Sequence, residues 1–191
     1  MVKKKISKKA KVKKEIKKLE TKVTKLLDQA KVKYKTIEHR VVYTAHDAAQ
    51  TTKKKLGEIA KVVLVKVTGA APVTLSERSE SKGPSKKDYF VLIVLPAHKY
   101  VDFSGIQKAL KVKKVSMASE KDITKYLKTK VGLLHPFGSE YNMQTLLDKG
   151  LSKSKKMIAS AGTYTHSVEL PLKDFEKLVK PLKGIFSKAK R

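Results

Sequence analysis

Two apolar runs, at residues 61–67 and 88–96, constrain the fold of this chain more than any other feature. The first reads K-V-V-L-V-K-V and the second reads D-Y-F-V-L-I-V-L-P. A strand with one face in water alternates apolar and polar residues, whereas these runs are almost continuously apolar and rich in β-branched residues. We therefore predict that both are central strands of one sheet.

Shorter patterns predict the elements around these two strands. Further strands are expected at residues 34–39, 114–118, 143–147, 156–159 and 165–170. Helices are expected at residues 45–56, with Thr44 as N-cap, and at residues 101–110, 119–127 and 171–180. Ser119 and Asp122 have the spacing of a capping box. The expected fold is α/β (α+β), with six or seven strands in a mixed, mostly β core flanked by helices.

The chain divides into three predicted parts: a basic N-terminal region at 1–30, a domain at 31–184 and a basic tail at 185–191. Within the first part, Ile16, Leu19, Val23 and Leu26 have the three- and four-residue spacing of an amphipathic helix that runs to about residue 30. The Ser- and Glu-rich segment at 74–87 is expected to be an inserted loop between the two central strands.

The charge of the chain indicates a polyanionic partner. Lysine and arginine total 45 against 17 acids, a formal net charge of +28. Lysine makes mobile point contacts to phosphate rather than fixed contacts to bases, which favours nucleic-acid backbone binding. The alternative is that the lysine content reflects the composition of the source proteome. The predicted nucleic-acid-binding residues are Lys3, Lys4, Lys5, Lys8, Lys9, Lys13, Lys14, Lys17 and Lys18.

Several common chemistries lack their motifs in this sequence. There is no cysteine, no G-x-G-x-x-G, no P-loop, no G-x-S-x-G and no H-x-x-x-H. We expect no cofactor and no metal. No signal-peptide pattern or apolar run long enough for a membrane span is present, so we expect a cytoplasmic protein without membrane contact.

Two places stand out as candidate site residues. Lys61 opens a strand that is otherwise apolar, where its ammonium could reach a cleft; the alternative is a lysine that extends to solvent from the strand end. In G-L-L-H-P-F-G, Gly132, Pro136 and Gly138 restrict the backbone to a rigid loop whose amides could face a ligand oxygen. The alternative is a tight connection whose apolar residues fill the core.

Two further candidates are a histidine and a small-residue stretch. His135 could carry a proton, although a loop histidine is also a common surface residue. The stretch A-S-A-G at 159–162, before T-H-S-V-E-L, indicates either a close approach at a strand end or a simple turn.

Taken in order, six segments of this chain resemble the YbaK/EbsC family of aminoacyl-tRNA deacylases, which is related to the editing domain of prolyl-tRNA synthetases. The segments are K-V-V-L-V-K-V, Y-F-V-L-I-V-L-P, K-Y-V-D-F, V-S-M-A-S, G-L-L-H-P-F-G and I-A-S-A-G-T-Y-T-H-S-V-E-L. The resemblance covers roughly residues 34–179. It departs from the family at K-T-K-V-G, where a Thr-Gly pair is common.

The resemblance implies the YbaK-like editing fold and hydrolysis of the ester that joins a wrong amino acid to tRNA. It implies an essential lysine at Lys61 and a pocket-shaping G-x-x-x-P loop from Gly132 to Pro136. It further implies no metal and no protein nucleophile, with the substrate's ribose hydroxyl helping to activate water. The substrate contacts expected on this basis are Leu133, Leu134, His135, Phe137, Gly138, Ser160, Gly162 and His166.

The resulting hypothesis is a freestanding trans-editing deacylase that removes a small residue such as Ala, Cys or Ser, on tRNA-Pro. Its expected partners are mischarged tRNA and an aminoacyl-tRNA synthetase, and a monomer is favoured. The main rival is a non-catalytic RNA- or ribosome-binding protein that has retained the fold. A second rival is a hydrolase of a free small molecule, which would not need a net charge of +28.

Overall fold

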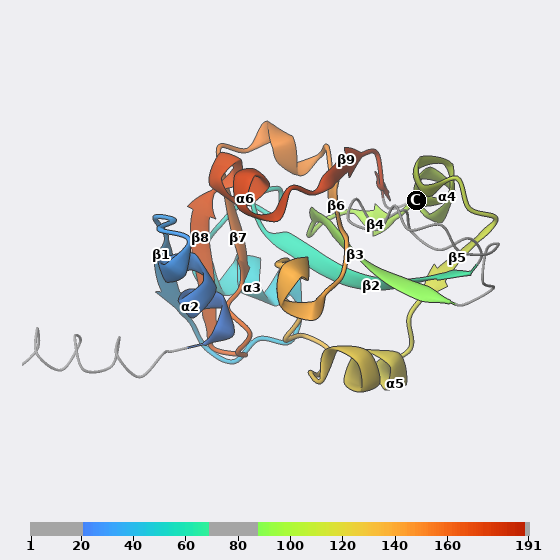
Figure 1. Ribbon diagram of the computed structural model, residues 1–191. Coiled ribbons are helices and arrows are strands. Elements are labelled where there is room, and N and C mark those ends of the chain that lie inside the picture. The colour runs from blue at the N-terminus through green and yellow to red at the C-terminus, as the bar shows by residue number, and fades with distance from the viewer. Residues whose placement is uncertain (1–20, 69–87, 190–191) are drawn as a thin grey trace, which may run out of the picture.

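The central strands predicted from the apolar runs are β2 (Ala60–Thr68) and β3 (Tyr89–Pro96), which pair antiparallel. The computed structural model describes residues 21–68 and 88–189 (Figure 1). β5 (Lys114–Met117) pairs with the end of β2, and β6 (Thr145–Asp148) runs parallel to β3. β9 (Leu182–Gly184) completes a five-stranded sheet of order β5-β2-β3-β6-β9. The prediction that the two apolar runs are central strands of one sheet is confirmed.

A second sheet lies beside the beginning of β2 (Figure 1). It contains β1 (Lys35–Glu38), β8 (His166–Pro171) and β7 (Lys156–Ser160), all antiparallel in the order β1-β8-β7. A third pair joins β4 (Tyr100–Val101) to β10 (Ser187–Lys188). The described residues thus form ten strands rather than six or seven, because three short pairing segments, β4, β9 and β10, have too few residues for a hydrophobic period.

The helices follow the predicted order with shorter bounds. They are α2 (Lys22–Gln29), α3 (Ala45–Thr52), α4 (Phe103–Leu110), α5 (Glu120–Asp122), which continues as a π-helical turn, and α6 (Leu172–Val179). α3 ends four residues earlier than predicted because Lys53 takes a left-handed conformation with φ of 54°. α4 begins at Phe103 because the Asp102 side chain accepts a hydrogen bond from the Ser104 amide and caps it.

α2 begins at Lys22, and the part of the predicted amphipathic helix before Thr21 lies outside the described residues. Thr21 is extended, with φ of −87° and ψ of 162°, and its side chain forms a capping box with Thr24. Val23 and Leu27 are fully buried. This helix therefore packs into the domain although it lies within the predicted basic region at 1–30.

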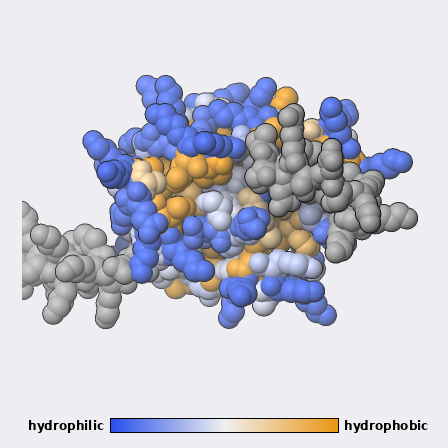
Figure 2. All heavy atoms as spheres, viewed as in Figure 1, coloured by the Kyte–Doolittle hydropathy of each residue, from blue (hydrophilic) through white to orange (hydrophobic). Residues whose placement is uncertain are grey.

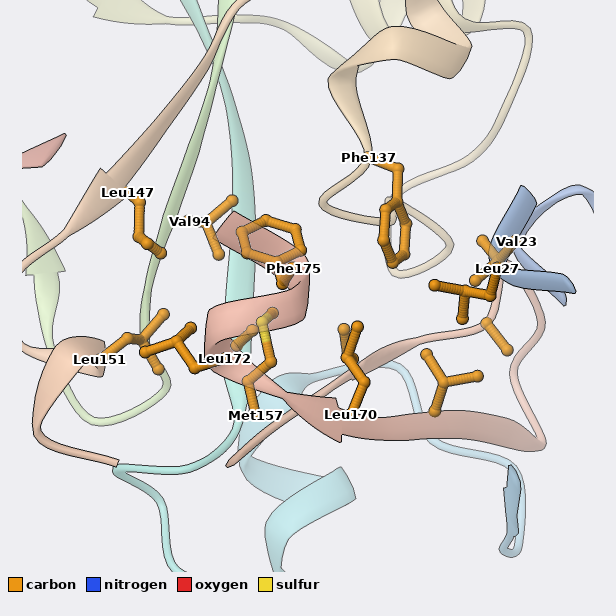
Figure 3. Close-up of a cluster of buried hydrophobic side chains, with 14 residues drawn as sticks. Val23, Leu27, Val94, Phe137, Leu147, Leu151, Met157, Leu170, Leu172 and Phe175 are labelled. Carbon is orange, nitrogen blue, oxygen red and sulfur yellow. The ribbon is translucent and has the colours of Figure 1, made fainter. Parts of the chain in front are cut away.

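The largest apolar cluster joins α2, the 132–138 segment, α6 and the sheets. Figure 3 shows Phe137 pointing between Phe175 of α6 and the α2 side chains Val23 and Leu27. The Phe137 and Phe175 rings meet edge to face with centroids 5.6 Å apart. Both rings are fully buried, so they tie the loop and both helices to one core.

The predicted basic tail at 185–191 is corrected for residues 186–188. Phe186 is fully buried, and Ser187 pairs with Val101 of β4. The carboxylate of Asp148, 1% exposed, accepts one hydrogen bond from the Phe186 amide and another from the Gly150 amide, each 2.7 Å long. These bonds hold the C-terminal segment to the end of β6.

The nine predicted nucleic-acid-binding lysines and the 74–87 loop lie outside the described residues. Within residues 21–68 and 88–189, no helix combines the length and apolar character that a bilayer crossing requires.

Candidate functional site

A cavity of about 250 Å³ lies where β2 separates from β7. We call it the β2–β7 cavity. Five segments line it: the beginning of β2, the end of β7, the connection from β1 into α3, the start of the Gly132 loop, and the chain from Thr163 to Ser167 at the start of β8. Most of its wall is apolar, through Val42, Ala45, Ala48, Ile59 and Ile158. A volume of this size fits a small side chain with its ester rather than a whole nucleotide.

Lys61 lines this cavity. Its ammonium donates a hydrogen bond to the Lys99 carbonyl and lies 5.2 Å from the ring centroid of Tyr100. Partial burial lowers the pKa of Lys61. Both contacts are to uncharged groups, and no carboxylate of the described residues forms a salt bridge with this ammonium. Its charge is therefore uncompensated. Neither Lys99 nor Tyr100 lines the cavity, so the ammonium has to turn from these contacts to meet a ligand there.

Gly132 brings the loop to the rim of the cavity. Its φ of +86° is strained for any other residue, and a Cβ there would lie 2.9 Å from the Tyr43 carbonyl. The Tyr43 and Tyr164 rings pack with centroids 5.0 Å apart, and the Tyr164 hydroxyl donates to the Val131 carbonyl over 3.3 Å. The rim is thus a close-packed contact of three segments that only glycine permits.

His39 and Ser167 form a polar part of the wall that the sequence reasoning missed. His39 Nδ1 lies 2.9 Å from the Arg40 carbonyl, which can only accept, so Nδ1 carries the proton. His39 Nε2 then accepts from the Ser167 hydroxyl over 2.9 Å. Thr163 also lines the cavity, and its buried hydroxyl has no hydrogen-bond partner. No local sequence motif identifies these two residues, because they lie 128 positions apart in the chain and meet only where β1 pairs with β8.

Three residues of the Gly132–Gly138 segment have different surroundings. Leu134 lines the β2–β7 cavity and is 8% exposed. Leu133 and His135 instead line a separate groove beside α2, together with Gly162. His135 is only 4% exposed and stacks on Tyr141 with centroids 4.4 Å apart. Burial, with the nearby Lys22 charge, lowers the pKa of His135 to about 4, so this ring is neutral at pH 7 and is not a surface histidine.

The rest of the segment is structural. Phe137 is in the core and lines neither cavity, because its ring fills the space between α2 and α6. Gly138 is buried, and a Cβ there would lie 2.3 Å from the Met143 carbonyl. Pro136 is buried, and its carbonyl accepts from the Thr145 hydroxyl over 3.4 Å. These three residues position the loop instead of contacting the cavity, which corrects the direct contacts expected for Phe137 and Gly138.

The small-residue stretch at 159–162 contributes to both the β2–β7 cavity and the groove beside α2. Ser160 lines the β2–β7 cavity, whereas Gly162 lies on the α2 groove with φ of +84°. The Gly162 amide donates to the Ser160 hydroxyl over 3.1 Å. His166 lines neither, and its Nδ1 lies 2.8 Å from the hydroxyl of the adjacent Thr165. The structure therefore brings together four of the predicted residues: Lys61, Gly132, Leu134 and Ser160.

The remaining features concern metals and the surface. In the part of the chain that the structure describes, no three His, Asp or Glu side chains are placed to hold a metal ion together. Figure 2 shows hydrophilic residues over much of one face, with smaller hydrophobic areas between them.

Comparison with known proteins gives a consistent result. A family model described as an aminoacyl-tRNA editing domain matches residues 39–178. A prolyl-tRNA editing protein, ProX, from Acetoanaerobium sticklandii is 27% identical over 158 residues, which cover 81% of this chain and 86% of that protein.

Solved structures share the fold at low identity. The crystal structure of hypothetical protein APE2540 has a TM-score of 0.72 at 15% identity, over 87% of this chain and 99% of that chain. The crystal structure of a candidate trans-editing enzyme for prolyl-tRNA synthetase has a TM-score of 0.67 at 17% identity, over 87% and 95% of the two chains. These likenesses confirm the predicted YbaK-like fold.

Proposed function

Because this chain belongs to the aminoacyl-tRNA editing domain family, we propose that it is a freestanding trans-editing deacylase that hydrolyses the ester of mischarged tRNA. The observation that carries the proposal is the β2–β7 cavity, where Lys61, a tight glycine rim and a largely apolar wall meet. A non-catalytic RNA-binding protein would need the charge but not this arrangement.

In the proposed reaction, the terminal adenosine lies at the mouth of the cavity and the aminoacyl group lies inside. The Lys61 ammonium binds a phosphate or carbonyl oxygen of the substrate, which its uncharged partners leave it free to do. The Gly132 amide donates to the carbonyl oxygen as negative charge develops there, which is worth on the order of 3 kcal/mol for a well-placed donor. Water attacks the ester, assisted by the substrate's ribose hydroxyl, and no metal ion or protein nucleophile takes part.

Specificity in this proposal comes from size. Ala45 and Ala48 on one side and Leu134 on another limit the space beside the ester, so a small residue such as Ala, Cys or Ser enters and a larger one is excluded. We propose tRNA-Pro as the carrier, which the relative named as a prolyl-tRNA editing protein supports.

The lysines of the N-terminal region are proposed to hold the tRNA body by its phosphates, without reading sequence. The proposal also includes a cytoplasmic monomer and cooperation with a synthetase. The editing domain in it contains α2 and residues 186–188, and the basic region before α2 serves this domain. A free small-molecule substrate would need none of this charge.

The proposal is tested by incubating the full chain with tRNA-Pro charged with Ala, Cys, Ser, Thr or Pro and measuring release of the amino acid, with and without EDTA. We expect release of one or two small residues, unchanged by the chelator. Tight, salt-sensitive tRNA binding without release of any amino acid would instead support the RNA-binding rival.

A further inference from the structure

The β2–β7 cavity opens between two strands that touch at one point and then part. Ile59 and Ile158 form an isolated parallel bridge, and the Ile158 amide donates to the Glu58 carbonyl over 2.9 Å. Beyond this bridge, β2 has no strand on this edge until β5 pairs with residues 65–68, among the described residues. The β2 residues of this interval, Val62 and Val63, line the cavity.

The backbone of Val62 faces this interval. In an antiparallel strand, the N–H and C=O of one residue point to the same neighbour, and residues two apart point to the same side. The Leu64 carbonyl accepts from the Ala118 amide on the β5 side over 3.1 Å. Val62, two residues earlier, therefore directs its N–H and C=O to the same edge, where it lines the cavity.

Ser160 presents its backbone from the opposite strand by the same reasoning. The Ala161 amide donates to the His166 carbonyl, beside β8, over 3.1 Å, and the Ile158 amide donates toward β2. The backbone N–H and C=O of Ser160 therefore point away from β8 and into the cavity that Ser160 lines. The buried hydroxyl of Thr163, which has no hydrogen-bond partner, adds a third polar group at the cavity. Polar groups in a largely apolar hollow are normally satisfied, which indicates a polar ligand between the strands.

An aminoacyl ester carries the complementary pair of groups. One Cα atom lies between its α-ammonium and its ester carbonyl, as one Cα lies between the N–H and the C=O of a residue in a strand. We propose that the aminoacyl group binds as a single residue of β-strand against Val62. Its ammonium donates to the Val62 carbonyl, and its ester carbonyl accepts from the Val62 amide, beside the Gly132 amide. The Ser160 carbonyl accepts a second ammonium proton.

This inference rests on the proposed function and adds a specificity rule to it. The contacts to Val62 use only groups that every aminoacyl ester possesses, so they cannot distinguish one amino acid from another. The cavity wall around the side chain therefore selects the amino acid. Hydroxyacyl and acetyl esters lack the α-ammonium, so they bind poorly.

The first test compares Val62→Pro with Val62→Ala. Proline removes the N–H that faces the cavity but no N–H of the β2–β3 ladder, and proline is tolerated on such a strand edge. Alanine keeps the N–H and shortens the same side chain. We expect kcat/KM for deacylation about tenfold lower in Val62→Pro than in Val62→Ala, as for loss of one hydrogen bond to a developing charge. Equal values in two folded variants would overturn the inference.

The second test uses the unaltered chain and stays decisive if Val62→Pro does not fold. In ¹⁵N-labelled protein titrated with 3′-alanylamino-3′-deoxyadenosine, a non-hydrolysable analogue, we expect the Val62 amide to shift and to become protected from hydrogen exchange. Saturation with the analogue that leaves this amide unprotected would refute the binding mode while deacylation by the same chain still stands. If the chain releases no amino acid from any charged tRNA, the proposed function and this inference fail together.

Discussion

His135 lies in a loop, yet its imidazole is buried, whereas a loop histidine is commonly exposed. It is 4% exposed, its Nδ1 has no hydrogen-bond partner, and its pKa falls from 6.5 to about 4. A protonated ring would put an unpaired charge into the core beside Tyr141. Its neutral form therefore contributes stability rather than proton transfer.

This pKa predicts how the free energy of unfolding depends on pH. The unfolded chain binds a proton near pH 6.5 and the folded chain only near pH 4, so the contribution is complete above pH 6.5 and is lost as pH falls toward 4. The difference between these two pKa values corresponds to about 3 kcal/mol of stability. Urea unfolding between pH 4 and 7 should show this loss in the wild type and a shallower dependence in His135→Phe. Parallel curves would contradict it.

Leu133 and Leu134 are neighbours that the structure assigns to different hollows. Leu134 lines the β2–β7 cavity, whereas Leu133 lines the groove beside α2. We expect Leu134→Ala to widen the range of amino acids released, because it removes wall from the cavity, and to cost about 2 to 5 kcal/mol of stability. Leu133→Ala is the matched control and should keep the wild-type profile. A wild-type substrate profile in both folded variants would show that Leu134 is a core residue only.

Helix ends in this protein use lysine where glycine is common. Lys53, Lys111 and Lys180 follow α3, α4 and α6 with φ between 47° and 54°. A side chain in this left-handed region costs free energy that glycine avoids, although lysine recovers part of it beside the helix carboxyl end.

We therefore expect Lys111→Gly to raise the free energy of unfolding by roughly 0.5 kcal/mol. Lys108→Gly removes the same charge from the same helix but inside it, and should lower the free energy by about 1 kcal/mol. Chemical denaturation of both variants measures the difference. Destabilisation of equal size in the two variants would show that the charge, rather than the backbone conformation, dominates at Lys111.

The elements that local sequence predicted are those with a strong hydrophobic pattern or cap. β2, β3 and α6 were located to within one or two residues because continuous apolar runs and a proline at a helix start are local signals. The end of α3 was missed because the left-handed Lys53 carries no such signal. At the site, Lys61 and Gly132 could be selected from the sequence, but His39 and Ser167 meet only through β1–β8 pairing.

At the scale of the whole molecule, α2 changes the boundary that the charge pattern suggested. Val23 and Leu27 are part of the core, so a deletion through residue 30 would damage the domain. Removing residues 1–20 keeps the Thr21 cap and removes the nine lysines predicted to bind tRNA.

For this deletion we expect a higher KM for charged tRNA and a weaker dependence of KM on salt, because each lost phosphate contact reduces the salt slope by about 0.7 to 0.9. The value of kcat should remain close to that of the full chain, since the cavity is untouched. KM and its salt slope, measured between 50 and 200 mM salt, check this. If neither changes, these lysines do not hold the substrate.

The proposed chemistry depends most on Lys61 at the β2–β7 cavity, and one comparison tests this role directly. Single-turnover deacylation of the substrate charged tRNA should be measured for the wild type, Lys61→Ala and Lys66→Ala. Lys66 lies on the same strand but pairs with Asp88 outside the cavity. We predict that Lys61→Ala slows release by about 100-fold or more while tRNA affinity and fold persist, and that Lys66→Ala stays near the wild-type rate. A Lys61→Ala rate within about twofold of the wild-type rate would contradict the proposed chemistry.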